Sequence, residues 1–149
     1  MSKRDLISVI VPCFNEEESL PAFYRETSKV LGNMRQVDWE MVLVDDGSSD
    51  GTQAIIKKLA EADSRVRYVV FSRNFGKEAG MYAGLKEAAG DYCVIMDADL
   101  QHPPALLPAM YQGVSREGFD CCGGLRMSRE GDGFLRSFFS RAFYKISKK

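Results

Sequence analysis

Two carboxylates stand directly after a strand-like apolar run in the segment "IMDADLQHPP" (95–104). Asp97 and Asp99 are separated by one small residue, and Gln101 follows at the next alternate position. Acids this close together repel each other and resist desolvation unless solvent, a cation or a basic group balances their charge. Mg²⁺ is usually held by one or two carboxylates together with substrate phosphates. The pair therefore predicts a clamp for Mg²⁺ or Mn²⁺ and a diphosphate, and the alternative is that both acids are solvated in a loop.

Three further polar segments have compositions typical of ligand-binding loops: "PCFNEE" (12–17), "DDGSSDGT" (45–52) and "SRNFGKEAG" (72–80). In the first, Asn15 could cap a helix whose positive end favours the acids that follow it. The second can cap a helix with a serine or with Asp50, which leaves Asp46 free to accept hydrogen bonds from a nucleobase. In the third, Arg73 and Lys77 flank a glycine that permits close backbone approach, which suits a phosphate-bearing ligand. Surface charge beside a turn is the alternative for this third segment.

The elements that must position these segments alternate along the chain. Short β-rich runs occupy 6–12, 40–45, 66–71, 92–97 and 119–125, and helical patterns occupy 20–34, 55–60, 81–88 and 106–114. The third helix is expected to pack through Met81, Tyr82, Leu85 and Ala88, which recur at helical spacing. Nearly all-apolar strands that alternate with helices predict an α/β fold with a parallel sheet covered on both faces. Ligands bind beyond the carboxyl ends of such strands, and all four polar segments follow strands.

Composition narrows the class of protein further. The 149 residues, of which 45% are hydrophobic, suffice for one domain over 1–149, and the net charge of −1 gives no indication of a nucleic-acid partner. The four cysteines form no C-x-x-C pair, so we expect small buried hydrophobes in a reducing compartment. His102 is assigned to a helix start rather than to the metal. No apolar run approaches the roughly 20 residues that span a bilayer, so a cytoplasmic location is expected.

The four segments, in this order and spacing, resemble the inverting family-two glycosyltransferases with the GT-A fold. They are most similar to the branch that transfers sugars to dolichyl or polyprenyl phosphate, including bactoprenol glucosyltransferase-like proteins. The resemblance implies metal-dependent transfer, with inversion, from a UDP- or GDP-linked sugar to a polyprenyl phosphate. A non-catalytic nucleotide-sugar-binding module and a glycosyltransferase with a non-lipid acceptor are the alternatives. A nucleotidyltransferase is disfavoured because it would normally place a glycine-rich basic loop after the first strand.

The resemblance also assigns roles to residues of this chain. It places Pro12, Phe14 and Glu16 by the nucleoside, and Val44 and Asp46 beside the base. It places Asp97, Ala98 and Asp99 at the ribose, diphosphate and metal, with Gln101 completing the metal shell. On the acceptor side it assigns the phosphate to Arg126, Arg136 and Ser140, and it makes Arg126 catalytic together with Asp97 and Asp99. Bidentate guanidinium contact to phosphate is the physical reason to prefer arginine there.

The last segment, 134–149, combines an apolar helical face with basic residues on the opposite face, namely Arg141, Lys145 and Lys148. Two interpretations remain open: a terminal helix that packs on the domain, or a helix that lies in the membrane interface. The second predicts a peripheral protein on the inner face of the cell membrane. Related enzymes continue beyond this helix, so we expect the acceptor-side end to be missing and a longer form to be membrane-anchored. The chain alone should then bind donor but transfer little sugar.

Overall fold

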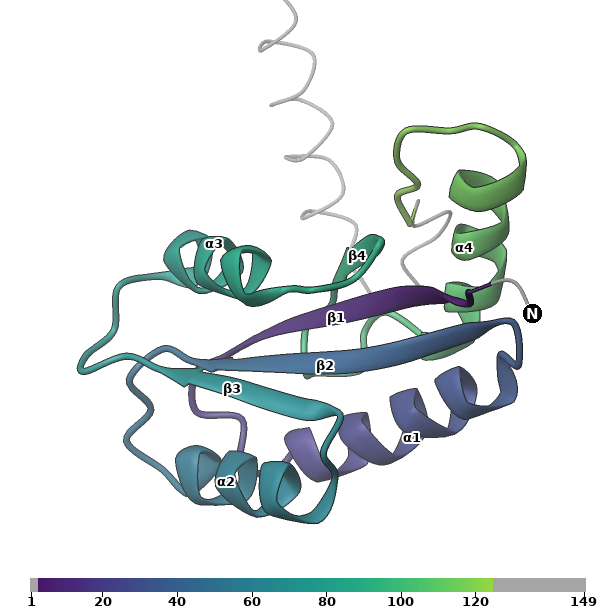
Figure 1. Cartoon of the computed structure of the whole chain (residues 1–149). Coiled ribbons are helices and arrows are strands. Elements are labelled where there is room, and N and C mark those ends of the chain that lie inside the picture. The colour runs from purple at the N-terminus through teal and green to yellow at the C-terminus, as the bar shows by residue number, and fades with distance from the viewer. Residues whose placement is uncertain (1–2, 125–149) are drawn as a thin grey trace, which may run out of the picture.

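The computed structural model describes residues 3–124, which form a four-stranded parallel sheet covered by helices (Figure 1). The strands are β1 (Asp5–Cys13), β2 (Val37–Asp45), β3 (Val66–Val70) and β4 (Tyr92–Ile95), in the order β3-β2-β1-β4. The helices are α1 (Leu20–Asn33), α2 (Thr52–Ala62), α3 (Lys77–Glu87), the 3-10 turn η1 (Pro104–Leu106) and α4 (Leu107–Arg116). The predicted α/β class with a parallel sheet is confirmed.

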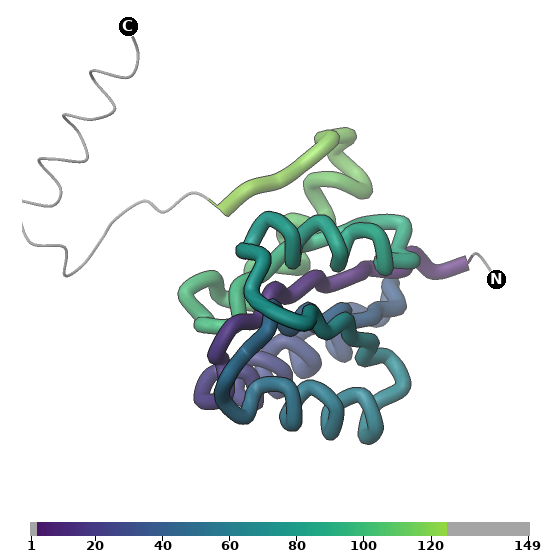
Figure 2. The backbone as a smooth tube through the Cα atoms, turned by 90° about the vertical axis from the view of Figure 1, so that its left-hand side faces the viewer, coloured from purple at the N-terminus to yellow at the C-terminus, as the bar shows by residue number. Residues whose placement is uncertain are grey.

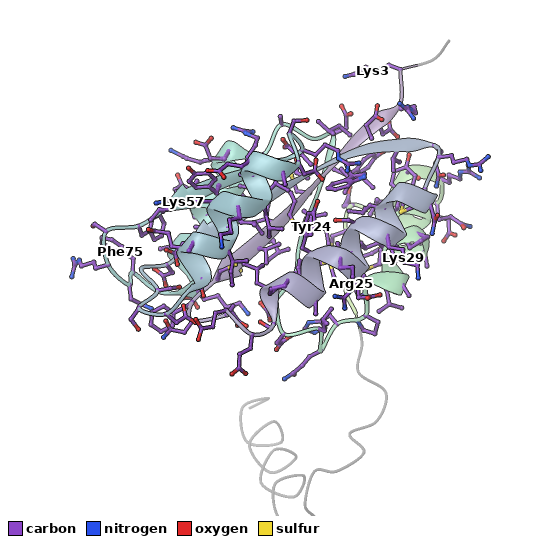
Figure 3. All side chains as sticks on the ribbon, turned by 90° about the horizontal axis from the view of Figure 1, so that it is seen from below. Lys3, Tyr24, Arg25, Lys29, Lys57 and Phe75 are labelled. Carbon is purple, nitrogen blue, oxygen red and sulfur yellow. The ribbon has the colours of Figure 1, made fainter. Side chains whose placement is uncertain are left out.

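The helices lie on both faces of the sheet. Figure 3, seen from below, shows α1 and α2 side by side on one face, and Figure 1 shows α3 on the other. Helix α1 packs because apolar side chains recur three and four residues apart, so that Leu20, Phe23 and Leu31 form one fully buried stripe. The two helices are also joined directly, since the Tyr24 hydroxyl donates to Asp63 Oδ2 at 2.7 Å, just after α2.

Helix α3 contacts the sheet through glycines, and the predicted apolar face of this helix was wrong. Tyr82 and Leu85 point outward and are 61% and 45% exposed, whereas Gly80 and Gly84 are buried. A Cβ on Gly80 would lie 3.4 Å from Pro12 Cβ, so α3 approaches β1 at backbone distance. Sequence periodicity ranks side chains by hydrophobicity, and therefore it does not register a contact made by residues without side chains.

This close approach predicts that Gly84→Ala destabilises the fold. The added Cβ would overlap the Ile10 side chain and lie 3.3 Å from Val44 Cγ2. We expect the free energy of unfolding to fall by about 2 kcal/mol, because overpacking outweighs the better helix propensity of alanine. Urea denaturation measures the change. Gly32→Ala in α1 is the matched control, since a Cβ there meets nothing within 4 Å and should be neutral or stabilising. Equal effects at the two glycines would contradict the packing argument.

A buried carboxylate fixes the turn between α3 and β4. Glu40 of β2 is 8% exposed, and its Oε1 accepts hydrogen bonds from Ser8 Oγ at 2.6 Å and from the Ala89 amide at 2.7 Å. Ser8 Oγ in turn accepts a hydrogen bond from the Gly90 amide at 2.8 Å. The backbone of this turn is therefore tied to the first half of the central strands. The turn connects the helix that begins with Lys77 to the strand that precedes Asp97.

Arg67 of β3 extends the same network to the end of α3. Its Nη1 lies 3.4 Å from Glu40 Oε2 and 2.6 Å from the Glu87 carbonyl oxygen, and its Nη2 lies 2.9 Å from Glu87 Oε2. Burial acts to raise the pKa of Glu40, but the hydrogen bonds that it accepts and the Arg67 guanidinium outweigh burial and lower that pKa below its ordinary value. Glu40 is therefore ionised at neutral pH and holds both partners.

The predicted fifth strand, 119–125, is not a strand over its described residues 119–124. Gly123 and Gly124 disfavour extended pairing, and Phe119 directs its amide to the Gly113 carbonyl instead. Within residues 3–124, the outer edge of β4 therefore pairs with no further strand. A largely apolar groove of about 590 Å³ lies between β4, α4 and segment 119–124.

All four cysteines are free, but only Cys13 is buried as expected. Cys93 and Cys121 are exposed and Cys122 is half-buried, and these three line the groove beside β4. In the described part of the chain, no helix has the length and apolar character needed to cross a bilayer.

Candidate functional site

The strand order places a ligand crevice between β1 and β4. The chain proceeds from β1 outward to β2 and β3 and then returns to the other side of β1, so this junction is the topological switch point of the sheet. Figure 2 faces the carboxyl edge of the sheet, where the loops that follow the strands lie together. A pocket of about 310 Å³ lies at this edge, lined by Pro12, Cys13, Phe14, Glu16, Asp46, Asn74, Gly76, Lys77, Asp97 and Asp99.

The loops that follow β1 and β2 are joined by hydrogen bonds between them. Asn15 adopts a left-handed backbone with φ of 56°, and its Oδ1 accepts from the Ser49 amide at 2.9 Å. In return, the Asn15 amide donates to Ser48 Oγ at 3.0 Å. Two residues on, Glu17 Oε2 accepts from the Gly51 amide at 2.6 Å. Asn15 and Glu17 therefore accept hydrogen bonds from the neighbouring loop, and Asn15 does not cap its own helix.

Glu16 lies at the pocket wall between these two joined residues. Its amide donates to Thr52 Oγ1 at 2.8 Å, and its carboxylate accepts a hydrogen bond from the Ser19 hydroxyl.

The thiol of neighbouring Cys13 is buried. Burial, followed by the charges of Glu16 and Asp45, raises the pKa of the Cys13 thiol far above its ordinary value. Because Cys13 remains a thiol at neutral pH, it cannot supply a thiolate nucleophile, although it lines the pocket.

Asp46 is not the spare carboxylate that sequence reasoning assumed. It is 3% exposed, and its Oδ1 and Oδ2 accept from the Phe75 and Gly76 amides at 2.7 and 2.9 Å. The next residue, Gly47, has φ of +71°, and a Cβ there would lie 2.7 Å from Arg73 Cα. Asp46 and Gly47 therefore hold the loop that leads into α3 against the loop after β2. The Asp46 side chain still lines the pocket.

Asp46→Asn is therefore expected to lower the free energy of unfolding by about 2 kcal/mol, since the amide group would turn an N–H toward one of the two backbone donors. Hydrogen exchange at the Phe75 and Gly76 amides should accelerate in the same variant. Asp120→Asn, at an exposed site, serves as the control. A fully stable Asp46→Asn variant that loses only nucleoside affinity would instead assign Asp46 to the base alone.

Lys77 and Asp97 form an ion pair across the pocket. Lys77 Nζ lies 2.6 Å from Asp97 Oδ1 and 2.8 Å from Oδ2, so the ammonium contacts both carboxylate oxygens. The Asp97 side chain is 31% exposed and the Lys77 side chain is 53% exposed. Lys77 is the first residue of α3, and it follows Gly76, whose φ of 96° sets the direction in which the helix starts.

The alternate spacing of the acids has a structural cause. Ala98 is 1% exposed and belongs to the core, whereas Asp97 and Asp99 on either side of it both line the pocket. Asp99 Oδ1 accepts from the Gln101 amide at 2.9 Å across Leu100, which has a left-handed φ of 58°. Gln101 is exposed and does not line the pocket. The segment thus presents two carboxylates and holds the second by its own turn.

The pocket fits a hard divalent cation that brings further ligands with it. Two carboxylates supply oxygen donors, and Asp97 already binds one cation, the Lys77 ammonium. Among residues 3–124, no group of three or more His, Cys, Asp or Glu side chains is arranged to hold a metal. Protein ligands alone therefore leave the shell incomplete, as is usual for Mg²⁺ bound through one or two carboxylates plus substrate phosphates. His102 lines the groove beside β4 and lies outside this pocket.

The structure brings most of the predicted donor-side residues to one place. The pocket wall includes Pro12, Phe14, Glu16, Asp46, Lys77, Asp97 and Asp99. Val44 is fully buried beneath α3 and Ala98 lies in the core, so both lie behind the wall rather than on it. Asn74 and Gly76 line the pocket but were not singled out as site residues, although the segment that contains them was. Arg126, Arg136, Ser140 and segment 134–149 lie outside the described residues.

Fold and site together define a doubly wound α/β domain whose ligand crevice is acidic and lies at the switch point. The model of the family described as glycosyl transferase family 2 matches residues 8–149. The chain belongs to this family, as its sequence motifs predicted.

Individual relatives agree with this assignment. The chain is 39% identical over 143 residues to the bactoprenol glucosyl transferase of Shigella phage SfV, covering 96% of this chain and 46% of that protein. It is 38% identical over 132 residues to the undecaprenyl-phosphate 4-deoxy-4-formamido-L-arabinose transferase of Salmonella choleraesuis, covering 88% and 40%. The chain thus spans less than half the length of these relatives.

A solved structure gives the same result. The mannosyltransferase PcManGT of Pyrobaculum calidifontis, in complex with GDP-Man and Mn²⁺, superposes with a TM-score of 0.50 at 30% identity. The match covers 66% of this chain and 28% of that one. A GT-A glycosyltransferase therefore shares the arrangement of strands and helices described above.

Proposed function

We propose that this chain is the donor-binding part of a glycosyltransferase that moves a sugar from a nucleoside diphosphate to a polyprenyl phosphate. The observation that supports this most directly is the pocket at the switch point, where Asp97, Asp99 and Lys77 meet. Two carboxylates and an ammonium at one edge suit a diphosphate bound together with Mg²⁺ or Mn²⁺. The Mn²⁺ and GDP-Man in the PcManGT complex support the same ligand class.

The names of the two relatives support one class of acceptor, but they do not agree on the sugar. Their names specify bactoprenol and undecaprenyl phosphate, which are both polyprenyl carriers, but two different sugars. We therefore propose a polyprenyl phosphate acceptor and leave the sugar and the base, uracil or guanine, to experiment. Arg126, Arg136 and Ser140 are proposed to hold the acceptor phosphate. Segment 134–149 is proposed to contact the inner face of the cell membrane through its basic residues.

The proposed reaction requires little proton transfer by the protein. A phosphate monoester has a second pKa near 6, so it is already largely ionised at neutral pH. One of its oxygens would attack the anomeric carbon from the face opposite the leaving diphosphate, and the bond from that carbon to the diphosphate oxygen would break, with inversion. Asp97 and Asp99 would hold the metal, which supplies neutralisation of charge on the departing diphosphate. Lys77 would contact the same diphosphate, and the pocket walls would orient the nucleoside.

The test has a binding arm and a transfer arm. Calorimetry of chain 1–149 with UDP, GDP and a panel of their sugars, with and without Mn²⁺, should show metal-dependent binding of one nucleotide. Release of nucleoside diphosphate and formation of lipid-linked sugar are then followed in parallel with undecaprenyl phosphate in micelles, using a form of the protein as long as its relatives. Donor binding without transfer by that longer form would favour a non-catalytic binding module. Absence of metal-dependent binding to either nucleotide would contradict the proposal.

A further inference from the structure

The ion pair between Lys77 and Asp97 has a geometry that bears on how the metal enters the pocket. The ammonium lies within 2.6–2.8 Å of both oxygens of the carboxylate, which is the position that a cation chelated by Asp97 would take. An ammonium and a divalent ion cannot share that position, since they repel each other strongly at such short distance. A divalent ion that takes this chelating position on Asp97 therefore requires Lys77 to leave.

We propose that Lys77 is an internal cation that blocks Asp97 to metal until a nucleoside diphosphate draws the ammonium away. This inference rests on the proposed function, because it takes a diphosphate as the ligand. Both side chains are partly exposed, so the pair is screened by solvent and can open without a large penalty. Lys77 would then exchange a carboxylate for a phosphate, and Asp97 would exchange an ammonium for the metal.

The surroundings of Lys77 favour that exchange. Lys77 begins an 11-residue helix, and the first amides of a helix form a positive end that attracts anions and disfavours a cation. The Asp97 carboxylate, which pairs with Lys77, offsets this repulsion. A diphosphate in the pocket would contact the same helix start as Lys77, since Gly76 and Lys77 both line the wall. The ammonium thus has two alternative anionic partners within one pocket.

The arrangement makes the binding of metal and nucleotide cooperative. Metal alone must displace Lys77 and should bind weakly, whereas metal in the presence of nucleotide finds Asp97 free. By linkage, the nucleotide must gain the same factor from the metal. Couplings of this kind typically amount to 5- to 150-fold, so removal of the lysine charge should change the affinity for metal alone by about tenfold.

The test measures Mn²⁺ binding to chain 1–149 by electron paramagnetic resonance of the free ion, without nucleotide and with saturating UDP or GDP. Lys77→Met should bind Mn²⁺ alone about tenfold more tightly than the unmodified chain. The increase in Mn²⁺ affinity on adding nucleotide should be smaller in this variant by a similar factor. Lys77→Arg, which keeps the charge, should retain weak binding of Mn²⁺ alone. Lys86→Met removes a charge from the exposed side of the same helix and should leave both affinities unchanged.

Circular dichroism establishes that each variant is folded before binding is compared. If Lys77→Met binds Mn²⁺ alone no more tightly than the unmodified chain, or not detectably, while its nucleotide affinity falls, then Lys77 is a phosphate ligand only and the inference is overturned. That result would leave the proposed function standing. Failure of the unmodified chain to bind either nucleotide at saturating Mn²⁺ would instead contradict the proposed function.

Discussion

Asp99→Asn is expected to lower the affinity of the chain for UDP or GDP by about 100-fold in the presence of Mn²⁺, and to have little effect without metal. Asp99 lines the pocket with one carboxylate oxygen turned to the Gln101 amide, which leaves the other as a candidate metal ligand. Loss of an outer-shell partner alone typically costs 10- to 100-fold in metal affinity, so replacing a charged ligand by a neutral amide should reach the upper end of that range. Calorimetry with and without Mn²⁺ measures both affinities.

Asp38→Asn provides the control for this substitution. Asp38 is exposed, belongs to the opposite end of β2 and pairs with Arg4 at 2.8 Å, so its change removes the same charge far from the pocket. Its nucleotide affinity should be unaltered with and without Mn²⁺. An Asp99→Asn chain that is folded and binds nucleotide with unchanged metal dependence would remove Asp99 from the metal site.

Glu40→Ala is expected to cost about 3 kcal/mol of the free energy of unfolding. The substitution leaves the Ala89 amide and the Ser8 hydroxyl without their acceptor and deprives Arg67 of one of its two carboxylates. Removing one partner of a buried polar group costs about 1–3 kcal/mol for each group left unsatisfied, and part of this is recovered where Arg67 remains exposed to water. Urea denaturation at neutral pH measures the loss, and exposed Glu61→Ala in α2 should change it little.

The same carboxylate predicts the pH dependence of the loss. The pKa of Glu40 in the folded chain lies below its ordinary value of 4.5, so the unfolded chain binds more protons in this range. The contribution of Glu40 is thus complete above its ordinary pKa and disappears as the pH falls through the lowered folded value. The stability difference between the unmodified chain and Glu40→Ala should therefore narrow in acid. A difference that stays constant down to acidic pH would show that packing, not charge, makes the contribution.

Much of the fold follows from local patterns. The four strands and the stripe of α1 were predicted because apolar side chains repeat with the period of each element. The face of α3 was wrong because Gly80 and Gly84 make the contact, and a contact between backbones leaves no hydrophobic signal. The strand predicted at 119–125 was wrong over its described residues 119–124, because a β-rich composition identifies a strand only where a neighbouring strand pairs with it.

The gathering of polar residues in one pocket was predictable for a different reason. Parallel strands bring their carboxyl ends to one edge, so polar residues after four strands had to meet there. The sequence did not predict the hydrogen bonds between loops that are distant along the chain. Asp46 was read as spare, yet it binds the Phe75 and Gly76 amides, and only the folded chain reveals those donors. Val44 was placed beside the base, but it is buried because its neighbour α3 lies so close to the sheet.

The hydrogen bonds between the loops after β1 and β2 have a consequence for how this site can be inherited. The Asn15 side chain accepts a hydrogen bond from the Ser49 amide, and the Glu17 side chain accepts one from the Gly51 amide. Each donor lies 34 residues away along the chain. Both donors are backbone amides, which every residue except proline supplies, so through these two bonds positions 49 and 51 can vary while positions 15 and 17 must keep an oxygen acceptor. A recombination event that brought in a first loop without these acceptors would leave the two amides without their partners. The constraint that these two bonds place on inheritance is therefore one-sided and falls on the loop after β1.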